Sequence, residues 1–488
     1  MKHKTTFFRL ALAGLLLTAT MSAPARAQQP DLDGAWLGTL EAGAIKLRLV
    51  FRFTRQVDGT YGAALDSPDQ GARGIPASSV EVKGDSVRVT LASLNAVYRG
   101  ALQPGAARIA GTFTQHGMSF PLELARTDEV PDPGRPRPQD PKEPLPYHSE
   151  DVVYENPAAP GVRLAGTFTR PREPGRYPAA LLITGSGPQN RNEEIMGHRP
   201  FLVLADHLTR RGIAVLRVDD RGVGESTGDF STATSADFAS DVRAGVAYLK
   251  SRDDVDPAAI GLIGHSEGGL IAPMVAAESD DVAWIVLMAG PGLPGDSILI
   301  LQAELIARAS GAPDTAIRWN QELQRTLFRI LREEPSDSAA RERVRAALRA
   351  FHERTRAALG QRPAEGTEAE AREAAIEQQV RQVVTPWYRY FIDYDPRPTL
   401  RRVKVPVLAL NGSLDLQVPS DPNLAAIREA LEQGGNRNVT IIEFPGLNHL
   451  FQTAKTGAPA EYAEIEETIA PAVLETIAEW VLGVSGRK

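Results

Sequence analysis

The chain of 488 residues contains no cysteine. Disulfide bonds, cysteine-based metal sites and lipid attachment at a cysteine are therefore excluded. A protein without disulfides must be stabilised by burial of apolar side chains. An apolar fraction of 42% in a chain of this length allows large cores.

Basic runs are also lacking beyond the extreme N-terminus, and the formal net charge is −7. This charge distribution disfavours nucleic acid as a partner. Beyond the N-terminal segment, no apolar run is long enough to span a bilayer.

Residues 1–27 have the three parts of a secretory signal peptide. Lys2, Lys4 and Arg9 precede the apolar stretch LALAGLLLTATM, and Ala25-Arg26-Ala27 forms an A-x-A cleavage site. Cleavage there would remove four basic residues and no acids, so the net charge would become −7 − 4 = −11. The sequence predicts an exported protein, periplasmic or secreted.

Two patterns divide the rest of the chain. Residues 28–126 contain short alternating runs such as KLRLVFRF, which predict a small all-β barrel or sandwich. A packing or docking role for this region is favoured over a ligand barrel. Residues 127–146 form a proline-rich linker, which marks a domain boundary.

Residues 147–488 contain continuous apolar runs such as AALLITG and VPVLALNG, separated by helical patterns. Continuous runs indicate strands that are covered on both faces, and hence a mostly parallel sheet with flanking helices. A helical lid is expected at about 296–395, where strand signals are missing. Ligands of such sheets bind at the carboxyl ends of the strands.

The hexapeptide GHSEGG places Ser266 between a buried strand and a helix. A G-x-S-x-G turn in this setting holds a serine hydroxyl at a sharp, exposed bend, as serine hydrolases require. Ser226 stands in a second match, GESTG, but no helix follows it directly. We interpret Ser226 as a loop residue.

A serine nucleophile needs a histidine base and an acid to orient it. In α/β-hydrolases the chain order is serine, acid, histidine, and only His352 and His449 follow Ser266. His352 lies in a helical pattern of the lid, whereas His449 follows the last strand. Asp415 follows the strand before it and is the predicted acid. Asp421 is the alternative, although its position suits a helix cap.

The oxyanion formed during ester cleavage needs two amide donors. One is expected at Glu267, the residue after the nucleophile. The other is expected in the loop that begins Thr184-Gly185, with Ser186 as the first candidate and Gly187 as the next. An ordinary glycine-rich turn remains an equal alternative for this loop.

Five motifs carry a resemblance to a known family: ITGSGPQNRNE (183–193), VDDRGVGES (218–226), GHSEGG (264–269), NGSLDLQV (411–418) and GLNHLF (446–451). The chain resembles secreted bacterial α/β-hydrolase carboxylesterases of the serine-aminopeptidase-like superfamily that have an N-terminal β-rich domain. The resemblance implies a Ser266–Asp415–His449 triad that cleaves small-molecule esters with short acyl groups, without a metal or cofactor. Many superfamily members have His-Gly where this chain has Thr184-Gly185.

Substrate contacts are predicted from fewer signals. Trp387 and Tyr390 belong to an aromatic cluster where the lid rejoins the sheet, and they either line a pocket or anchor the lid. Arg191 either binds a substrate carboxylate or forms a structural ion pair. Two other functions remain open, a serine peptidase or amidase and a non-catalytic protein that binds a lipophilic ligand.

Overall fold

The computed structural model describes residues 31–486 with short gaps, so the expected signal peptide at 1–27 lies outside the described residues. The gaps are 43–44, 57–58, 69–71, 95, 104, 106, 116–117, 129–136, 359, 361 and 363–366.

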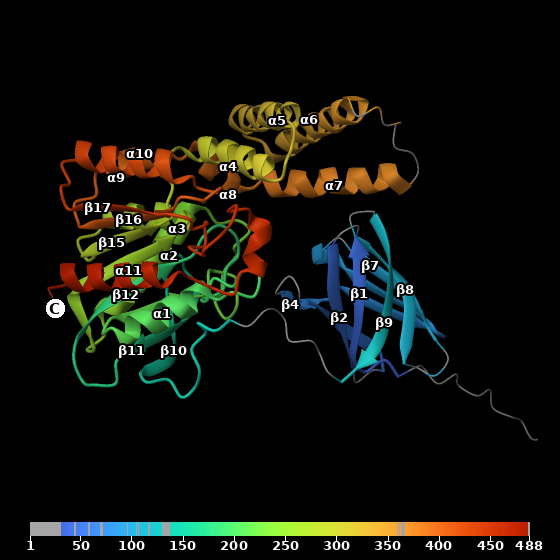
Figure 1. Ribbon diagram of the computed structural model, residues 1–488, viewed down its shortest axis with the longest axis horizontal. Coiled ribbons are helices and arrows are strands. Elements are labelled where there is room, and N and C mark those ends of the chain that lie inside the picture. The colour runs from blue at the N-terminus through green and yellow to red at the C-terminus, as the bar shows by residue number, and fades with distance from the viewer. Residues whose placement is uncertain are drawn as a thin grey trace, which may run out of the picture.

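The N-terminal region forms one antiparallel sheet of nine strands (Figure 1). Its order is β4-β3-β2-β1-β9-β8-β7-β6-β5, and β3 also contacts β5, so the sheet curls on itself. The alternating pattern that predicted it has a direct cause, since Phe51 and Phe53 are buried while Arg52 between them is exposed. The predicted β-rich region is confirmed as one curled sheet, not two facing sheets. The strands are β1 (Gly34–Ala42), β2 (Ile45–Arg55), β3 (Tyr61–Ser67), β4 (Ala72–Pro76), β5 (Ser79–Lys83), β6 (Ser86–Leu91), β7 (Ala96–Leu102), β8 (Arg108–Gln115) and β9 (Met118–Thr127).

A second sheet of eight strands has the order β10-β11-β13-β12-β14-β15-β16-β17. The pairs β10–β11 and β11–β13 are antiparallel, and all later neighbours are parallel. The prediction of a mostly parallel sheet is therefore confirmed. The strands are β10 (His148–Glu155), β11 (Arg163–Arg170), β12 (Tyr177–Ile183), β13 (Ala214–Val218), β14 (Val255–His265), β15 (Trp284–Met288), β16 (Val407–Gly412) and β17 (Val439–Phe444).

Helices cover both faces of this sheet, which explains why its central strands are apolar throughout. One face packs against α1 (Pro200–Arg210) and α11 (Pro471–Val484). The other face packs against four helices: α2 (Ser235–Lys250), α3 (Glu267–Ala276), α9 (Pro396–Leu400) and α10 (Ser420–Gln433).

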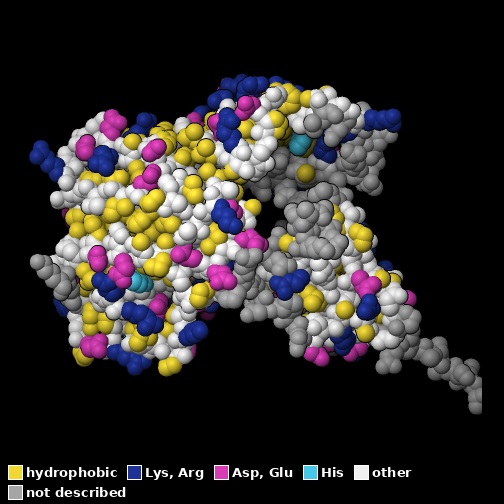
Figure 2. Space-filling model, in the orientation of Figure 1, with side chains coloured by type: hydrophobic (Ala, Val, Ile, Leu, Met, Phe, Trp, Pro, Cys, Tyr) yellow, Lys and Arg dark blue, Asp and Glu magenta, His cyan; other side chains and the backbone are white. Residues whose placement is uncertain are grey.

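Six helices lie between β15 and β16 in the chain. The sixth is α9, and the first five lie at the top of Figure 1. They share a small core of their own around Phe328, Val344 and Val380. Arg349 and Arg354 form ion pairs between these helices, and charged side chains of both signs cover this part of the surface (Figure 2). The helices are α4 (Gly295–Ala309), α5 (Asp314–Glu333), α6 (Asp337–Ala358), α7 (Thr367–Val383) and α8 (Pro386–Asp393).

Within the part of the chain that the structure describes, no helix combines the length and the apolar character needed to cross a membrane.

Candidate active site

Ser266 is the single residue between the end of β14 and the start of α3, and it lies at the carboxyl edge of the parallel strands. Its backbone has φ 53° and ψ −117°, a strained conformation for a residue with a side chain. The turn has no room for larger neighbours, because a Cβ at Gly264 would overlap Gly268 and one at Gly268 would overlap Ile183. The Ser266 amide also donates to the Met288 carbonyl at 2.8 Å, which holds the turn against β15.

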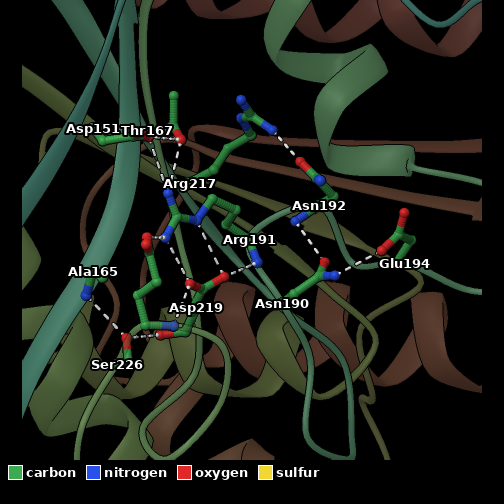
Figure 3. Close-up of polar contacts among 11 residues, drawn as sticks. Asp151, Ala165, Thr167, Asn190, Arg191, Asn192, Glu194, Arg217, Asp219 and Ser226 are labelled. Atoms are coloured by element: carbon green, nitrogen blue, oxygen red, sulfur yellow. Dashed lines mark hydrogen bonds and ion pairs between the residues drawn. The ribbon is translucent and has the colours of Figure 1, made fainter. Parts of the chain in front are cut away.

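The serine of the second G-x-S-x-G match has a different environment. Ser226 is buried, its hydroxyl donates to the Asp219 carbonyl at 2.7 Å, and it accepts from the Ala165 amide at 2.9 Å (Figure 3). The contact with Ala165 fastens the loop to β11, and the contact with Asp219 closes the loop after β13 on itself. The Ser226 hydroxyl is thus engaged in local structure.

His449 and Asp415 lie in contact, in the loops after β17 and β16. His449 Nδ1 donates to Asp415 Oδ2 at 2.8 Å, and the Asp415 side chain is fully buried. The other carboxylate oxygen accepts from the amides of Gln417 and Val418, each at 2.8 Å. Backbone donors therefore fix this carboxylate, and the carboxylate in turn fixes the imidazole.

The alternative residues lie elsewhere. Asp421 is exposed in the first turn of α10, where Pro419 occupies the N-cap position. His352 lies on α6 among the inserted helices, with its ring against Phe351.

Ser266 and His449 line one pocket, which encloses about 820 Å³ including its open mouth. This size suits a small organic ligand. Helices α4 and α8 supply Ile298, Leu299, Trp387 and Phe391 to the pocket wall. The inserted helices thus form part of the pocket. Its remaining lining residues are Gly185, Ser186, Gln189, Glu193, Ile195, His265, Glu267, Pro291, Gln302, Gln417, Val418 and Leu450.

The loop after β12 borders the pocket with Gly185 and Ser186. The Gly185 amide donates to Glu193 Oε1 at 2.7 Å, so this amide already has a partner. Ser186 is exposed at the pocket wall. Glu267 begins α3, and the first amides of a helix have no partner within the helix. Ser186 and Glu267 line the pocket that contains Ser266, whereas Gly187 is not among its lining residues, and the assignment of the oxyanion donors stays a prediction.

Thr184 helps to hold the loop after β12 in place. Its hydroxyl donates to Asp220 Oδ1 at 2.7 Å, and the Gln189 amide donates to Asp220 Oδ2 at 2.9 Å. Burial raises the pKa of Asp220 to about 7, against the lowering effect of these hydrogen bonds. The Asp220 carboxyl group thus joins both ends of the segment from Thr184 to Gln189 in the loop after β12.

His265 and Glu193 form a buried pair next to the nucleophile turn. His265 Nδ1 lies 2.9 Å from Glu193 Oε1, and Nε2 lies 3.0 Å from the His449 carbonyl oxygen. Burial alone would lower the pKa of His265, but the Glu193 carboxylate raises it above its ordinary value. Both ring nitrogens face oxygen acceptors, which agrees with a charged imidazolium that donates from both sides.

The Glu267 side chain makes a second buried cluster beside the pocket. Its Oε1 accepts from the Ser235 hydroxyl at 2.6 Å and from the Trp387 indole at 2.8 Å. Burial raises the pKa of Glu267, although hydrogen bonds from Ser235, Trp387 and Ser186 act in the opposite direction. One carboxyl group thus connects α2, α8 and the loop after β12.

Of the three predicted substrate-binding residues, Trp387, Tyr390 and Arg191, only Trp387 lines the pocket. Trp387 lines the pocket and also anchors α8 through Glu267, so both interpretations of the aromatic cluster apply to it. Tyr390 stacks on Tyr394 with ring centroids 5.6 Å apart and is not among the residues that line the pocket.

Arg191 also stands outside the residues that line the pocket. Its guanidinium bonds Asp219 at 2.7 Å, Glu225 at 2.7 Å and Asp151 at 3.1 Å (Figure 3). These contacts are those of the structural ion pair rather than of a substrate ligand, and they join three segments around the loop after β12.

Sequence reasoning did not single out Glu193, His265 or the side chain of Glu267. All three residues do lie inside motifs that carry the family resemblance, ITGSGPQNRNE and GHSEGG. Within the described residues, no group of three or more histidine, aspartate or glutamate side chains is arranged to hold a metal ion.

The sequence profile of the alpha/beta hydrolase family matches residues 181–465, a range that contains Ser266, Asp415 and His449. The chain is 26% identical over 343 residues to Esterase EstD of Thermotoga maritima, covering 69% of this chain and 70% of the relative. It is 32% identical over 136 residues to an uncharacterized protein of Mycobacterium tuberculosis, covering 28% and 44%.

Solved structures similar to the chain include the alpha/beta hydrolase GrgF from Penicillium sp. sh18, with 15% identity and a TM-score of 0.42. That comparison covers 70% of this chain and 99% of GrgF. A second is the Pyrococcus furiosus esterase Pf2001, with 15% identity and a TM-score of 0.41, covering 70% of this chain and 91% of the esterase.

Proposed function

Because the chain belongs to the alpha/beta hydrolase family, we propose that it hydrolyses carboxylic esters through a triad of Ser266, His449 and Asp415. The observation that carries the proposal is the 2.8 Å contact between His449 and a fixed, buried Asp415, with His449 and Ser266 on the wall of one pocket. The relative Esterase EstD supports an ester as the bond that is cleaved.

In the proposed reaction, the Ser266 hydroxyl attacks the ester carbonyl while His449 Nε2 takes its proton. The Asp415 carboxylate accepts from Nδ1, which keeps Nε2 free as a base and stabilises the imidazolium. His449 then protonates the departing alcohol, leaving an acyl group on Ser266. Water activated by His449 releases the acid and restores the serine.

The tetrahedral intermediate carries a negative charge on the former carbonyl oxygen. We assign its stabilisation to the amides of Glu267 and Ser186. The Glu267 amide benefits from its position at the N-terminus of α3, where the helix dipole favours negative charge. The hydrogen bond from the Gly185 amide to Glu193 supports the role of Ser186, because this bond fixes the residue that precedes Ser186.

Short acyl groups fit the proposed enzyme best. The part of the pocket wall that α4 and α8 form with Ile298, Leu299, Trp387 and Phe391 is apolar. A wall in this place limits the length of an acyl chain attached to Ser266. An ester series of increasing acyl length would measure this limit.

The deciding experiment compares Ser266→Ala with Ser226→Ala, since each change removes one serine from a G-x-S-x-G match. We expect Ser266→Ala to lower ester turnover by about 10⁴-fold or more and to abolish labelling by a fluorophosphonate probe. Ser226→Ala should stay labelled and active, with a loss of stability of about 1–3 kcal/mol from its buried hydrogen bonds. Turnover near the wild-type value in Ser266→Ala would disprove the assignment.

Export is a separate part of the proposal, supported by the signal-like residues 1–27. Expression in a bacterial host followed by N-terminal sequencing should find a mature protein that begins after Ala27 in the periplasm or medium. An intact N-terminus in the cytoplasmic fraction would contradict it.

A further inference from the structure

The charged residues at the pocket are unequally distributed. Of the described residues that line it, Glu193 and Glu267 are acidic, whereas lysine and arginine do not occur among them. The only groups there that could carry a positive charge are the imidazoles of His265 and His449.

Each of these imidazoles already faces a carboxylate. His265 lies 2.9 Å from Glu193, and His449 lies 2.8 Å from Asp415. Glu267 has no such partner in the described contacts, because Ser235 and Trp387 bond it as neutral donors. Among the described lining residues, the pocket therefore has no unpaired cation left for an anionic ligand, and it has one carboxyl group, that of Glu267, beyond those that are paired.

Two arginines that lie close in sequence to lining residues form ion pairs with other side chains. Arg191 is held by Asp219 at 2.7 Å, and Arg389, two residues after Trp387, pairs with Asp337 at 3.1 Å. Moving either guanidinium toward the pocket would break these ion pairs.

The aromatic part of the wall is compatible with positive charge. Trp387 and Phe391 stack with ring centroids 5.0 Å apart and an interplanar angle of 19°. The faces of aromatic rings attract cations, whereas they offer nothing to a carboxylate. The lining residues Ile298, Leu299 and Leu450 are apolar, and the side-chain donors among the other lining residues are neutral (Ser186, Gln189, Gln302 and Gln417). A bound carboxylate would therefore lose water without gaining a charged partner.

We propose that the pocket selects esters by charge, accepting uncharged and cationic esters and rejecting anionic ones. This inference rests on the proposed ester hydrolysis at Ser266. The aromatic wall and the carboxyl group of Glu267 favour the cation, and none of the described lining residues offers a guanidinium or ammonium group to the anion.

Three butyrate esters test the proposal on the full chain. Their alcohols are methyl 4-hydroxybenzoate, 4-hydroxybenzoate and 4-(trimethylammonio)phenol, which place no charge, a negative charge or a positive charge at one position. Each kcat/KM is divided by the rate constant of the same ester with hydroxide, which removes the difference in leaving groups.

We expect the normalised kcat/KM of the anionic ester to be about 30-fold or more below that of the neutral ester. The cationic ester should equal or exceed the neutral one. An anionic ester within about threefold of the neutral ester would overturn the proposal. So would an equal loss for both charged esters, because an apolar wall alone would then explain the selection.

A gain-of-function variant makes the test sharper. Gln302 on α4 lines the pocket, and its amide donates to Gln417 Oε1 at 3.1 Å. We expect Gln302→Arg to raise the ratio of anionic to neutral turnover about tenfold, and Gln302→Met of similar length to leave it unchanged. Melting curves check that both variants fold. An unchanged ratio in a folded Gln302→Arg would contradict selection by charge.

The two proposals fail in different ways. Loss of neutral-ester turnover in Ser266→Ala establishes the site, whatever the charged esters do. If Ser266→Ala kept that turnover, the proposed function would fail before the charge series was interpreted.

Discussion

His265 and Glu193 form a buried ion pair beside the proposed nucleophile, with Nδ1 and Oε1 2.9 Å apart. The pair reaches in two directions, since Glu193 accepts from the Gly185 amide and His265 donates to the His449 carbonyl. It therefore connects the loop after β12, the nucleophile turn and the loop that carries the base. We infer that it positions both sides of the reacting centre.

Glu193→Gln should lower kcat about 10- to 100-fold, with a smaller change in KM. The Gly185 amide and His265 Nδ1 both contact Oε1, and a neutral glutamine oxygen there no longer stabilises the imidazolium, so the common support of the two loops is weakened. Steady-state kinetics on a neutral ester would measure the split. Glu194→Gln is the matched control, because Glu194 is exposed and bonds only the nearby Asn190 among the described contacts. Equal losses in the two variants would contradict a positioning role.

The same pair gives a pH dependence of stability. The pKa of His265 in the folded protein is raised above its ordinary value of 6.5, through Glu193 and against the effect of burial. Its contribution is therefore fully present below pH 6.5 and is lost as pH rises through the higher folded pKa. The free energy of unfolding of the wild type should fall toward that of His265→Gln as the pH rises above 6.5 and through the raised pKa of His265. Urea unfolding of both proteins would measure this, and a constant difference would refute it.

Asp415→Asn should lower kcat by about 10⁴-fold with little change in KM. An asparagine amide facing His449 Nδ1 would favour the wrong imidazole tautomer, so that Nε2 no longer accepts the serine proton. Asp421→Asn makes the same chemical change six residues later in the exposed first turn of α10, and it should keep full activity. Should Asp421→Asn lose activity and Asp415→Asn retain it, the acid would be Asp421.

Particular residues show why some of this arrangement could be predicted from sequence. Continuous apolar runs predicted the parallel sheet because its strands are covered on both faces. The positions of Asp415 and His449 followed from chain order, since loops after adjacent parallel strands open at one edge. The alternation in the first region predicted strands, but it could not distinguish one curled sheet from two facing sheets. Side-chain alternation is the same in both.

Directions of side chains were harder to predict. Glu193 has φ 51°, so its segment turns back toward Gly185, which no pattern of residue types indicates. Trp387 and Tyr390 were predicted as members of one aromatic cluster, but only Trp387 lines the pocket. Phe391, four residues after Trp387, shares its side of the helix, while Tyr390 turns to Tyr394.

Trp387→Phe isolates the hydrogen bond by which α8 is joined to the nucleophile turn. Phenylalanine keeps an aromatic ring beside Phe391 but removes the indole donor 2.8 Å from Glu267. The helix then loses its polar anchor, so we expect KM for a neutral ester to rise about 3- to 10-fold with a smaller change in kcat. Tyr390→Phe is the control, because it removes a hydroxyl from a side chain that does not line the pocket. If Tyr390→Phe raised KM as much as Trp387→Phe, the effect would come from general loosening of α8, and the bond to Glu267 would have no special role in forming the pocket.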